Sequence, residues 1–230
     1  MEIIAVIPAR GGSKGVLKKN IRLLADKPLI HYTIHTAQHS RYIDHVIVST
    51  DDDEITNVAL KDGAQVIKRP PEIAGDDAST IEAVFHVLSQ YKGRGLEPKL
   101  VVLLQPTSPF RTSFDIDAAL DIFLQNDCDS VVSLVETTHP PYWNMVLEGS
   151  YLKPLFNQEY LTKRRQDLPK TYLPNGAIYI ASAETLKQTH SFYTPKTKPY
   201  IMPAERSLDI DSEFDLLFAE VLLKHGADHD

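Results

Sequence analysis

Apolar runs alternate with segments of helical periodicity along the first two-thirds of the chain. Short runs rich in β-branched residues predict buried strands, and segments with apolar residues every three or four positions predict helices. The expected strands are 3–7, 45–49, 100–104, 130–135 and 177–181, and the expected helices are 29–38, 53–61, 79–91, 115–125 and one that begins at Ser212. This alternation predicts an α/β fold with three layers, in which helices cover both faces of a mostly parallel sheet.

Two of the expected helices carry local signals. Ser79 and Glu82 have the spacing of a capping box at the start of the third helix. The last helix has an apolar stripe and is expected to stop at Gly226. The stripe consists of Phe214, Leu217, Phe218, Val221 and Leu222. No internal repeat interrupts the pattern, so we expect a single domain over residues 1–230.

The pattern changes in residues 139–173. This segment holds several prolines, four tyrosines and the only tryptophan, Trp143, and it has little clean periodicity. It predicts an inserted excursion that packs on something else, because aromatic side chains supply contact area in oligomers. A plain surface loop is the alternative, but it would leave Tyr142, Phe156 and Tyr160 exposed.

The first strand is followed by a cationic glycine loop. Glycines let the backbone approach a ligand closely, and the lysine and arginine side chains suit phosphate oxygens. The loop residues in question are Arg10, Gly11, Gly12, Lys14, Gly15 and Lys19. The spacing fits neither a P-loop nor the dinucleotide-binding fingerprint. A triphosphate cradle is the simplest interpretation, and a solvated turn is the alternative.

A second candidate site lies at Asp209 and Asp211. Residues two apart in an extended segment project to the same face, so both carboxylates can face one hard cation while Ile210 turns into the core. Helix capping by Asp211 or Ser212 is the alternative. The more conspicuous acidic run 51–54 follows a strand and opens a helix, so we interpret it as structural.

The composition of the chain excludes several classes of function. Thirty-one acidic and 24 basic residues give a net charge of -7, which argues against a nucleic-acid partner. No apolar run reaches the length of a membrane helix, and no charged leader is visible, so a cytoplasmic protein without a membrane partner is expected. The lone Cys128 excludes an intrachain disulfide, and the nine histidines form no zinc motif.

Four segments in order, IPARGGSKGVLKKN, QPTSPFR, PNGAIYI and SLDIDSEFD, resemble the acylneuraminate cytidylyltransferase family, the CMP-sialic acid synthetases. The resemblance implies a Rossmann-like nucleotidyltransferase domain that couples CTP to a nine-carbon α-keto acid sugar and releases pyrophosphate. It also implies Mg²⁺ as cofactor and a homodimer formed through the excursion. Enzymes that activate the eight-carbon sugar Kdo carry a different first loop. A Kdo-type nucleotidyltransferase and a non-catalytic nucleotide-binding module remain the alternatives.

The resemblance assigns site residues. The phosphates and ribose of the nucleotide are expected to contact Arg10, Lys14, Lys19 and Asn20, and the base is expected to contact Arg69, Ala78 and Thr80, where Thr80 replaces a usual serine. The sugar is expected to contact Gln105, Asn175, Gly176, Tyr179, Phe192 and Tyr193, with Arg165 offered to the sugar carboxylate of the neighbouring subunit.

The metal-binding and catalytic residues follow from the same resemblance. Asp209 and Asp211 match the family's metal-binding pair. Arg10 and Lys19 are expected to stabilise the charge that develops on the phosphates, and Asp211 is the first candidate to accept the proton. The alternatives from the residues themselves are that Gln105 is a strand-end polar residue and that residues 175–176 form only a turn. For Arg69 the alternative is a solvated charge with a buried stem.

Two positions depart from the pattern of enzymes for N-acetylneuraminic acid. Where those enzymes carry Lys and Arg, this chain has Tyr142 and Leu173. A pocket that replaces cations by rings and aliphatic groups should favour a less hydroxylated sugar, because buried hydroxyls without partners are costly. This favours a deoxy, diacetamido sugar such as legionaminic acid.

Overall fold

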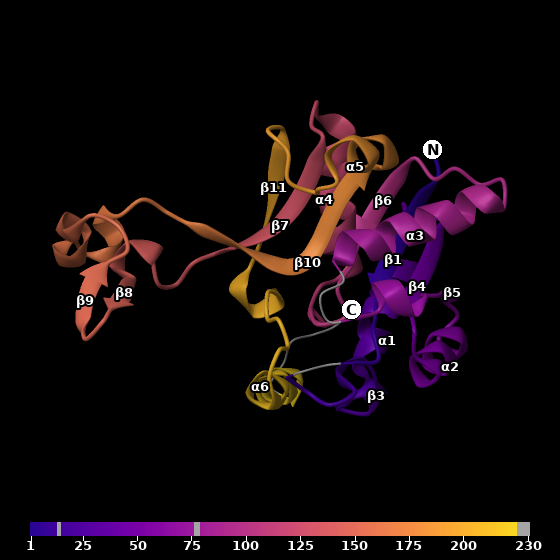
Figure 1. Cartoon of the computed structure of the whole chain (residues 1–230), viewed down its shortest axis with the longest axis horizontal. Coiled ribbons are helices and arrows are strands. Elements are labelled where there is room, and N and C mark those ends of the chain that lie inside the picture. Colours follow the sequence, from indigo (N-terminus) through magenta and orange to yellow (C-terminus); the bar gives the residue numbers. More distant parts are fainter. Residues whose placement is uncertain (13–14, 76–78, 225–230) are drawn as a thin grey trace.

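The centre of the molecule is a twisted, seven-stranded sheet with the strand order β11-β7-β10-β6-β1-β4-β5 (Figure 1). The computed structural model describes residues 1–12, 15–75 and 79–224. The strands are β1 Ile3–Pro8, β4 His45–Thr50, β5 Gln65–Lys68, β6 Leu100–Leu103, β7 Ser130–Glu136, β10 Tyr172–Ser182 and β11 Thr197–Met202. Strand β10 runs antiparallel to both of its neighbours, and the other neighbouring pairs of this sheet are parallel. The prediction of a mostly parallel sheet is confirmed.

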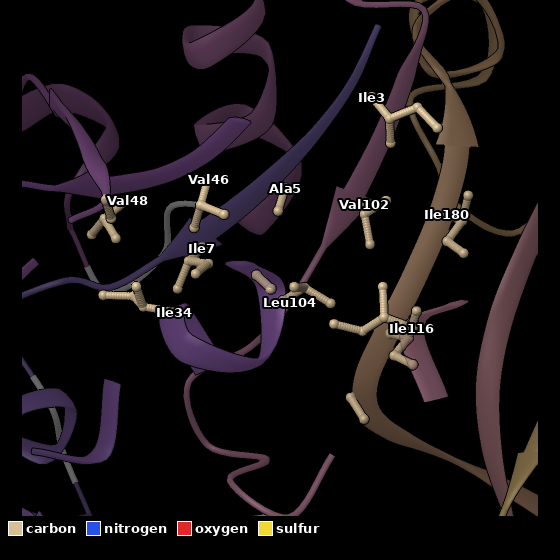
Figure 2. Close-up of a cluster of buried hydrophobic side chains, with 14 of the residues drawn as sticks. Ile3, Ala5, Ile7, Ile34, Val46, Val48, Val102, Leu104, Ile116 and Ile180 are labelled. Carbon is tan, nitrogen blue, oxygen red and sulfur yellow. The ribbon is translucent and has the colours of Figure 1, made fainter. Parts of the chain in front are cut away.

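Helices cover both faces of the sheet, which confirms the three-layer prediction. They are α1 Leu29–Gln38, α2 Asp53–Lys61, α3 Thr80–Gly93, α4 Ser113–Gln125, α5 Ala183–Thr189 and α6 Glu213–Lys224. Strand β1 is buried on both sides: Ile3, Ala5 and Ile7 pack with residues of α1, α2 and α4 (Figure 2), while Ile4 and Val6 pack with residues of α3 and α5. Alternate side chains of one strand therefore anchor both outer layers.

The sequence pattern did not predict two strands of this sheet. Strand β5 has four residues, and strand β11 contains Lys198 and Pro199 within its short span. They are the two outermost strands of the sheet. An outermost strand pairs with a neighbour on one side only, and proline is tolerated there. Edge strands need fewer apolar residues than central ones, so their pattern is weaker.

The helix caps explain the acidic run 51–54. The Asp52 carboxylate accepts hydrogen bonds from the backbone N–H groups of Glu54 and Ile55, at 2.7 and 2.9 Å, and caps α2. Asp51 accepts a hydrogen bond from the Gly11 N–H at 3.0 Å. The structural interpretation of this run is confirmed, as is the capping box of α3 between Ser79 and Glu82.

Helix α6 contacts the body through a different face from the stripe seen in the sequence. Leu216 and Ala219 are buried with Ile210 in a small cluster. Four residues of the stripe lie exposed, with Phe214 75% accessible. They are Phe214, Leu217, Phe218 and Val221. The apolar periodicity therefore predicted the helix but not the face that packs.

Residues 137–171, which we call the arm, leave the sheet between β7 and β10 and project away from the body (Figure 1). At its base the Thr137 N–H donates to the Thr171 carbonyl at 2.9 Å. A hairpin of β8 Met145–Glu148 and β9 Tyr151–Pro154 forms its far part, with short 3-10 turns at Pro141–Trp143, Gln158–Thr162 and Arg165–Asp167.

The remaining short elements are close to the first loop and to α6. They are the 3-10 turns Lys19–Ile21, Pro71–Ile73 and Ala204–Arg206 and the two-stranded sheet of β2 Leu23–Leu24 and β3 Lys27–Pro28. Across the described ranges 1–12, 15–75 and 79–224, no helix combines the length and the apolar character needed to cross a membrane.

Candidate active site

The first loop begins at the carboxyl end of β1, the edge at which open α/β sheets bind ligands. The Asn20 side chain is buried and donates to the Arg10 carbonyl at 2.9 Å, which holds the two ends of the loop together. The Arg10 guanidinium donates to the Gly75 carbonyl at 3.2 Å. Lys14, which we expected in this loop, lies outside the described residues.

Arg69 follows β5 on the same edge of the sheet. Its guanidinium is buried and donates to the Ser49 hydroxyl at 3.3 Å and to the Ser49 carbonyl at 2.9 Å. It forms no ion pair within the part of the chain that the structure describes. Burial lowers the pKa of Arg69 below its ordinary value. The negative charge of Asp51 opposes this shift, and the positive charge of Arg10 adds to it. Two guanidinium groups close enough to influence each other favour an anion here.

The other residues expected at the base are placed only in part. Thr80 is the first residue of α3 and is half-buried. Ala78 lies outside the described residues. The cytosine pocket expected around Arg69 and Thr80 therefore stays a prediction.

Asp209 and Asp211 flank a fully buried Ile210, as the spacing predicted. The Ile210 N–H donates to the Thr107 carbonyl at 2.8 Å, which ties this segment to the loop after β6. One oxygen of Asp209, Oδ1, is buried and has no hydrogen-bond partner. Burial raises the pKa of the Asp209 carboxyl above its ordinary value, and the charge of Asp211 adds to this, although a hydrogen bond from Thr107 opposes it.

An orphaned carboxylate oxygen beside a second carboxylate fits a hard divalent cation. No group of three or more His, Cys, Asp or Glu within the described residues is arranged to hold a metal. Two carboxylates completed by substrate phosphates and water are the usual donor set for Mg²⁺ in nucleotide enzymes. The residues present therefore fit a magnesium ion that binds together with a nucleotide.

The first loop and the acidic segment meet directly. Lys19 Nζ lies 2.9 Å from Asp211 Oδ1, an ion pair between residues 192 positions apart. Gly15 packs against the Asp211 carbonyl so closely that a Cβ atom at Gly15 would overlap it. The predicted phosphate cradle and the predicted metal pair are thus parts of one site.

Gln105 lies at the end of β6, next to Gly176 of β10. Gly176 has a positive φ of 75°, and a Cβ there would come within 2.6 Å of Gln105 Oε1. Below them, the buried guanidinium of Arg111 donates to the Ala177 carbonyl at 2.7 Å and to the Thr33 hydroxyl at 2.8 Å. The structure therefore brings Gln105 and Gly176 together, as expected of two sugar contacts.

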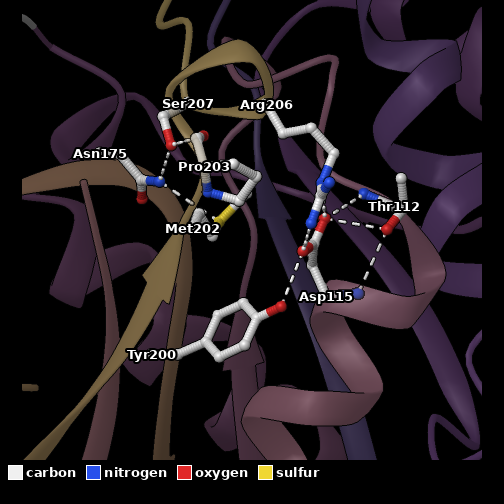
Figure 3. A network of polar contacts seen from close by, with 8 residues as sticks. All are labelled: Thr112, Asp115, Asn175, Tyr200, Met202, Pro203, Arg206 and Ser207. Atoms are coloured by element: carbon white, nitrogen blue, oxygen red, sulfur yellow. Dashed lines mark hydrogen bonds and ion pairs between the residues drawn. The ribbon is translucent and has the colours of Figure 1, made fainter. Parts of the chain in front are cut away.

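Asn175 is buried and its side chain is occupied by the protein. Its Oδ1 accepts from the Ser133 hydroxyl at 2.6 Å. Its Nδ2 donates to the Ser207 hydroxyl at 2.9 Å and to Met202 Sδ at 3.2 Å (Figure 3). This side chain cross-links β7, β10 and the segment before Asp209. Its expected contact with the sugar stays a prediction.

Three aromatic residues expected around the sugar form one cluster. The ring centroid of Tyr179 lies 5.8 Å from that of Phe192 and 6.3 Å from that of Tyr193. Burial raises the pKa of the Tyr179 hydroxyl, and the charges of Tyr193 and Asp209 act in the same direction. The three rings therefore meet at Tyr179.

Arg165 begins the 3-10 turn Arg165–Asp167 of the arm. Its side chain is exposed and forms no hydrogen bond or ion pair with the residues that the structure describes. The structure does not bring Arg165 to the cleft of its own chain. Its role at a neighbouring subunit stays a prediction.

One network near the site was not expected. The fully buried carboxylate of Asp115 accepts hydrogen bonds from Thr112, Tyr200 and Arg206 (Figure 3). The spacing of Thr112 and Asp115 matches a capping box, so the sequence held a signal for half of this network. The pairing of Asp115 with Arg206, 91 residues away, has no local signal.

The family model described as Cytidylyltransferase matches residues 4–221, nearly the whole described chain. The chain belongs to the cytidylyltransferase family. Among curated relatives, the N-acylneuraminate cytidylyltransferase of Streptococcus agalactiae serotype III is 38% identical over 220 residues. The match covers 94% of this chain and 52% of that protein, so the chain spans about half the length of this relative. The resemblance seen in the four sequence segments is confirmed.

A second curated relative matches this chain over nearly the full length of both proteins. The CMP-N,N'-diacetyllegionaminic acid synthase of Legionella pneumophila is 37% identical over 228 residues, which cover 97% of each chain. Among solved structures, CMP:2-keto-3-deoxy-manno-octonic acid synthetase complexed with CTP superposes with a TM-score of 0.74 at 16% identity, over 98% of this chain and 99% of the other. At that identity the likeness shows the fold alone.

Proposed function

We propose that this protein is an enzyme that joins CTP to a nine-carbon α-keto acid sugar of the sialic or legionaminic acid type, giving a CMP-sugar and pyrophosphate. The observation that carries the proposal is the contact between Lys19 and Asp211, because it makes the phosphate loop and the carboxylate pair one site. The names of the two curated relatives support the same reaction. CTP is a cytosolic nucleotide, which supports a cytoplasmic location.

In the reaction, the anomeric oxygen of the sugar forms a bond to the α-phosphorus of CTP, and the bond from that phosphorus to the β-phosphate oxygen breaks. Arg10 and Lys19 bind triphosphate oxygens and stabilise the charge that moves onto the leaving pyrophosphate. Asp209 and Asp211 would hold Mg²⁺, which would neutralise phosphate charge and favour deprotonation of the attacking hydroxyl. The protein's part is mainly to position the reactants and to compensate charge.

The proton of the attacking hydroxyl needs an acceptor. Asp211 is the candidate that we propose, directly or through a water molecule, because it is an exposed carboxylate at the cleft. Asp209 is buried with a raised pKa, and its unpartnered oxygen suits the cation rather than a proton relay. Tyr179, Phe192 and Tyr193 provide apolar ring surface for the sugar.

Pyrophosphate release tests this function. CTP, ATP, GTP and UTP should each be offered with N-acetylneuraminic acid, N,N'-diacetyllegionaminic acid and Kdo. We expect release only with CTP and a nine-carbon sugar. Release with Kdo alone would support the Kdo-type alternative, and CTP binding without any release would support a non-catalytic nucleotide-binding module.

We propose further that two copies form a homodimer through the arm. Large apolar side chains on the arm are exposed, among them Leu147, Tyr151 and Leu152. An apolar surface on a projecting segment favours burial against a second chain. The exposed Arg165 would then pair with the sugar carboxylate in the partner's cleft, a geometry for which a guanidinium is well suited. Sedimentation that shows a fully active monomer at micromolar concentration would contradict this.

For the identity of the sugar, we propose legionaminic acid over N-acetylneuraminic acid. Tyr142 and Leu173 stand where cations are expected for the latter, and Leu173 is exposed on the part of β10 nearest the arm. Tyr142 also packs against Phe156 and Tyr160, with ring centroids 5.5 and 4.9 Å apart, so its ring has a structural role within the arm. The ratio of kcat/KM for the two sugars decides this, and a preference for N-acetylneuraminic acid would reject it.

A further inference from the structure

The turn that precedes the carboxylate pair makes few apolar contacts, although Leu208 and Ile210 after it pack in a small core cluster. Six residues separate the end of β11 at Met202 from Asp209. Within them, the turn Ala204–Arg206 is exposed or half-buried and contributes no apolar core residue. Polar contacts to the body therefore help to fix the position of this turn.

The principal contact is the pairing of Arg206 with Asp115 of α4 (Figure 3). Arg206 Nη2 lies 2.8 Å from Asp115 Oδ1, and Nε lies 3.0 Å from Oδ2, so the pair is bidentate. A bidentate guanidinium fixes direction as well as distance. Burial acts to raise the pKa of Asp115, but the hydrogen bonds from Arg206, Thr112 and Tyr200 outweigh it and hold the pKa below its ordinary value.

The same carboxylate also contacts Thr112, which follows the loop after β6. Asp115 Oδ2 accepts from the Thr112 N–H at 2.9 Å and from the Thr112 hydroxyl at 2.8 Å. Thr112 directly follows the loop 105–111 that carries Gln105. One buried carboxylate thus joins the loop that we assign to the sugar and the segment that we assign to the metal.

Asp209 lies between two fixed points. Arg206 is three residues before it, and Ile210, immediately after it, is buried and bonded to Thr107. Three residues span at most about 10 Å, so fixing both ends restricts where the Asp209 carboxylate can lie. The bond from Asn175 to Ser207 is a second anchor on the same stretch.

We propose that Arg206 and Asp115 are positioning residues that hold Asp209 and Asp211 in the geometry that binds a divalent cation, and that neither contacts the substrates. The inference rests on the proposed function only for the assignment of this pair as the metal site. Its consequence is specific: loss of the Arg206 contact should weaken cation binding more than it weakens CTP binding.

The test measures Mn²⁺ binding from the loss of the free-ion signal in electron paramagnetic resonance, with the full chain and CTP present and no sugar added. The Mn²⁺ that CTP binds by itself is measured in a protein-free sample and subtracted. Arg206→Met and Arg206→Lys both lose the bidentate contact, and the second keeps the charge. We expect each to raise the Mn²⁺ dissociation constant by about 10-fold or more, as for other groups that orient metal ligands.

Tyr200→Phe is the matched control. It removes one hydrogen bond to the same carboxylate, from the Tyr200 hydroxyl at 2.7 Å, and leaves both Arg206 bonds in place. A variant that acts only through general destabilisation of this region would behave like Tyr200→Phe. We expect Tyr200→Phe to bind Mn²⁺ within about 2-fold of the wild type, although it also loses a hydrogen bond to the charged Asp115 carboxylate.

Equal Mn²⁺ affinity in the wild type and both Arg206 variants would overturn the inference, as would a wild type that binds no Mn²⁺. The proposed function fails separately, if the wild type releases no pyrophosphate with any nine-carbon sugar. The Mn²⁺ comparison does not require turnover, so it still decides the positioning role in that case.

Discussion

Replacing Gly176 by alanine should displace the Gln105 side chain while Gln105 itself stays in the sequence. The backbone of Gly176 has φ +75°, where a residue with a Cβ atom is less stable by about 1–2 kcal/mol. The added Cβ would lie 2.6 Å from Gln105 Oε1, while Ser108 Oγ at 3.6 Å is at an ordinary contact distance. The Gln105 side chain is flexible, so it should swing away at small cost in stability.

Gly95→Ala is the control for the backbone term. Gly95 has φ +77°, and a Cβ atom there meets nothing within 4 Å. Both variants should lose about 1–2 kcal/mol of stability, which lowers Tm by about 2–8 °C for a chain of this size. Only Gly176→Ala should lower kcat/KM for the sugar, by about 5- to 100-fold if Gln105 makes a hydrogen bond to it. The KM for CTP should stay within about 2-fold in both.

A double variant separates displacement of Gln105 from other effects of the new methyl group. In a Gln105→Ala background the clash is absent, so adding Gly176→Ala should change kcat/KM for the sugar by less than about 2-fold. Steady-state pyrophosphate release and thermal unfolding are the two measurements. If Gly176→Ala and Gly95→Ala show the same sugar kcat/KM at equal stability loss, Gln105 does not bind the sugar and the reasoning is refuted.

Three further predictions concern carboxylates and the arm. Asp209→Asn and Asp211→Asn should each abolish most pyrophosphate release without unfolding the protein. The control variant Asp53→Asn, at an exposed position, should release pyrophosphate like the wild type. Undiminished turnover of both Asp209→Asn and Asp211→Asn at limiting magnesium would contradict the metal assignment. Chains with Arg165→Ala co-expressed with chains carrying Asp211→Asn should recover about a quarter of wild-type activity, because half the dimers hold one intact composite site; no recovery means that Arg165 does not act across the dimer. Asp115→Asn should lower the free energy of unfolding by about 3–5 kcal/mol at pH 7 in urea titrations. Because folding depresses the pKa of Asp115, this stabilisation is present above its unfolded pKa of about 3.9 and is lost as the pH falls through the folded value; a deficit that is constant from pH 7 to pH 3 would contradict it.

The central part of the fold could be predicted because its signals are local. The predicted helices 29–38 and 53–61 match α1 and α2 residue for residue, since each is bounded by a clear change from strand to helical periodicity. Strand β1 was visible as a continuous apolar run, which is what burial on both faces produces. The edge strands β5 and β11 were missed because one-sided pairing places little demand on their side chains.

The candidate site was predicted in its parts but not in its assembly. The spacing of Asp209 and Asp211 predicted a shared face, and the buried Ile210 agrees with it. The contact of Lys19 with Asp211 depends on the whole sheet order, which spacing along the chain does not encode. The same holds for the pairing of Asp115 with Arg206. Taken one at a time, their sequence positions indicate only a helix cap at Asp115 and a surface charge at Arg206.

The ion pair between Lys19 and Asp211 has a consequence for the order in which ligands arrive. A divalent cation that comes alone must compete with Lys19 for Asp211, and a triphosphate that comes alone must draw Lys19 away from Asp211. When cation and triphosphate come together, the ion pair is broken once for two binding events. By linkage, each ligand should then tighten the binding of the other by the same factor. A divalent cation and a triphosphate are therefore expected to bind best when they arrive as one complex.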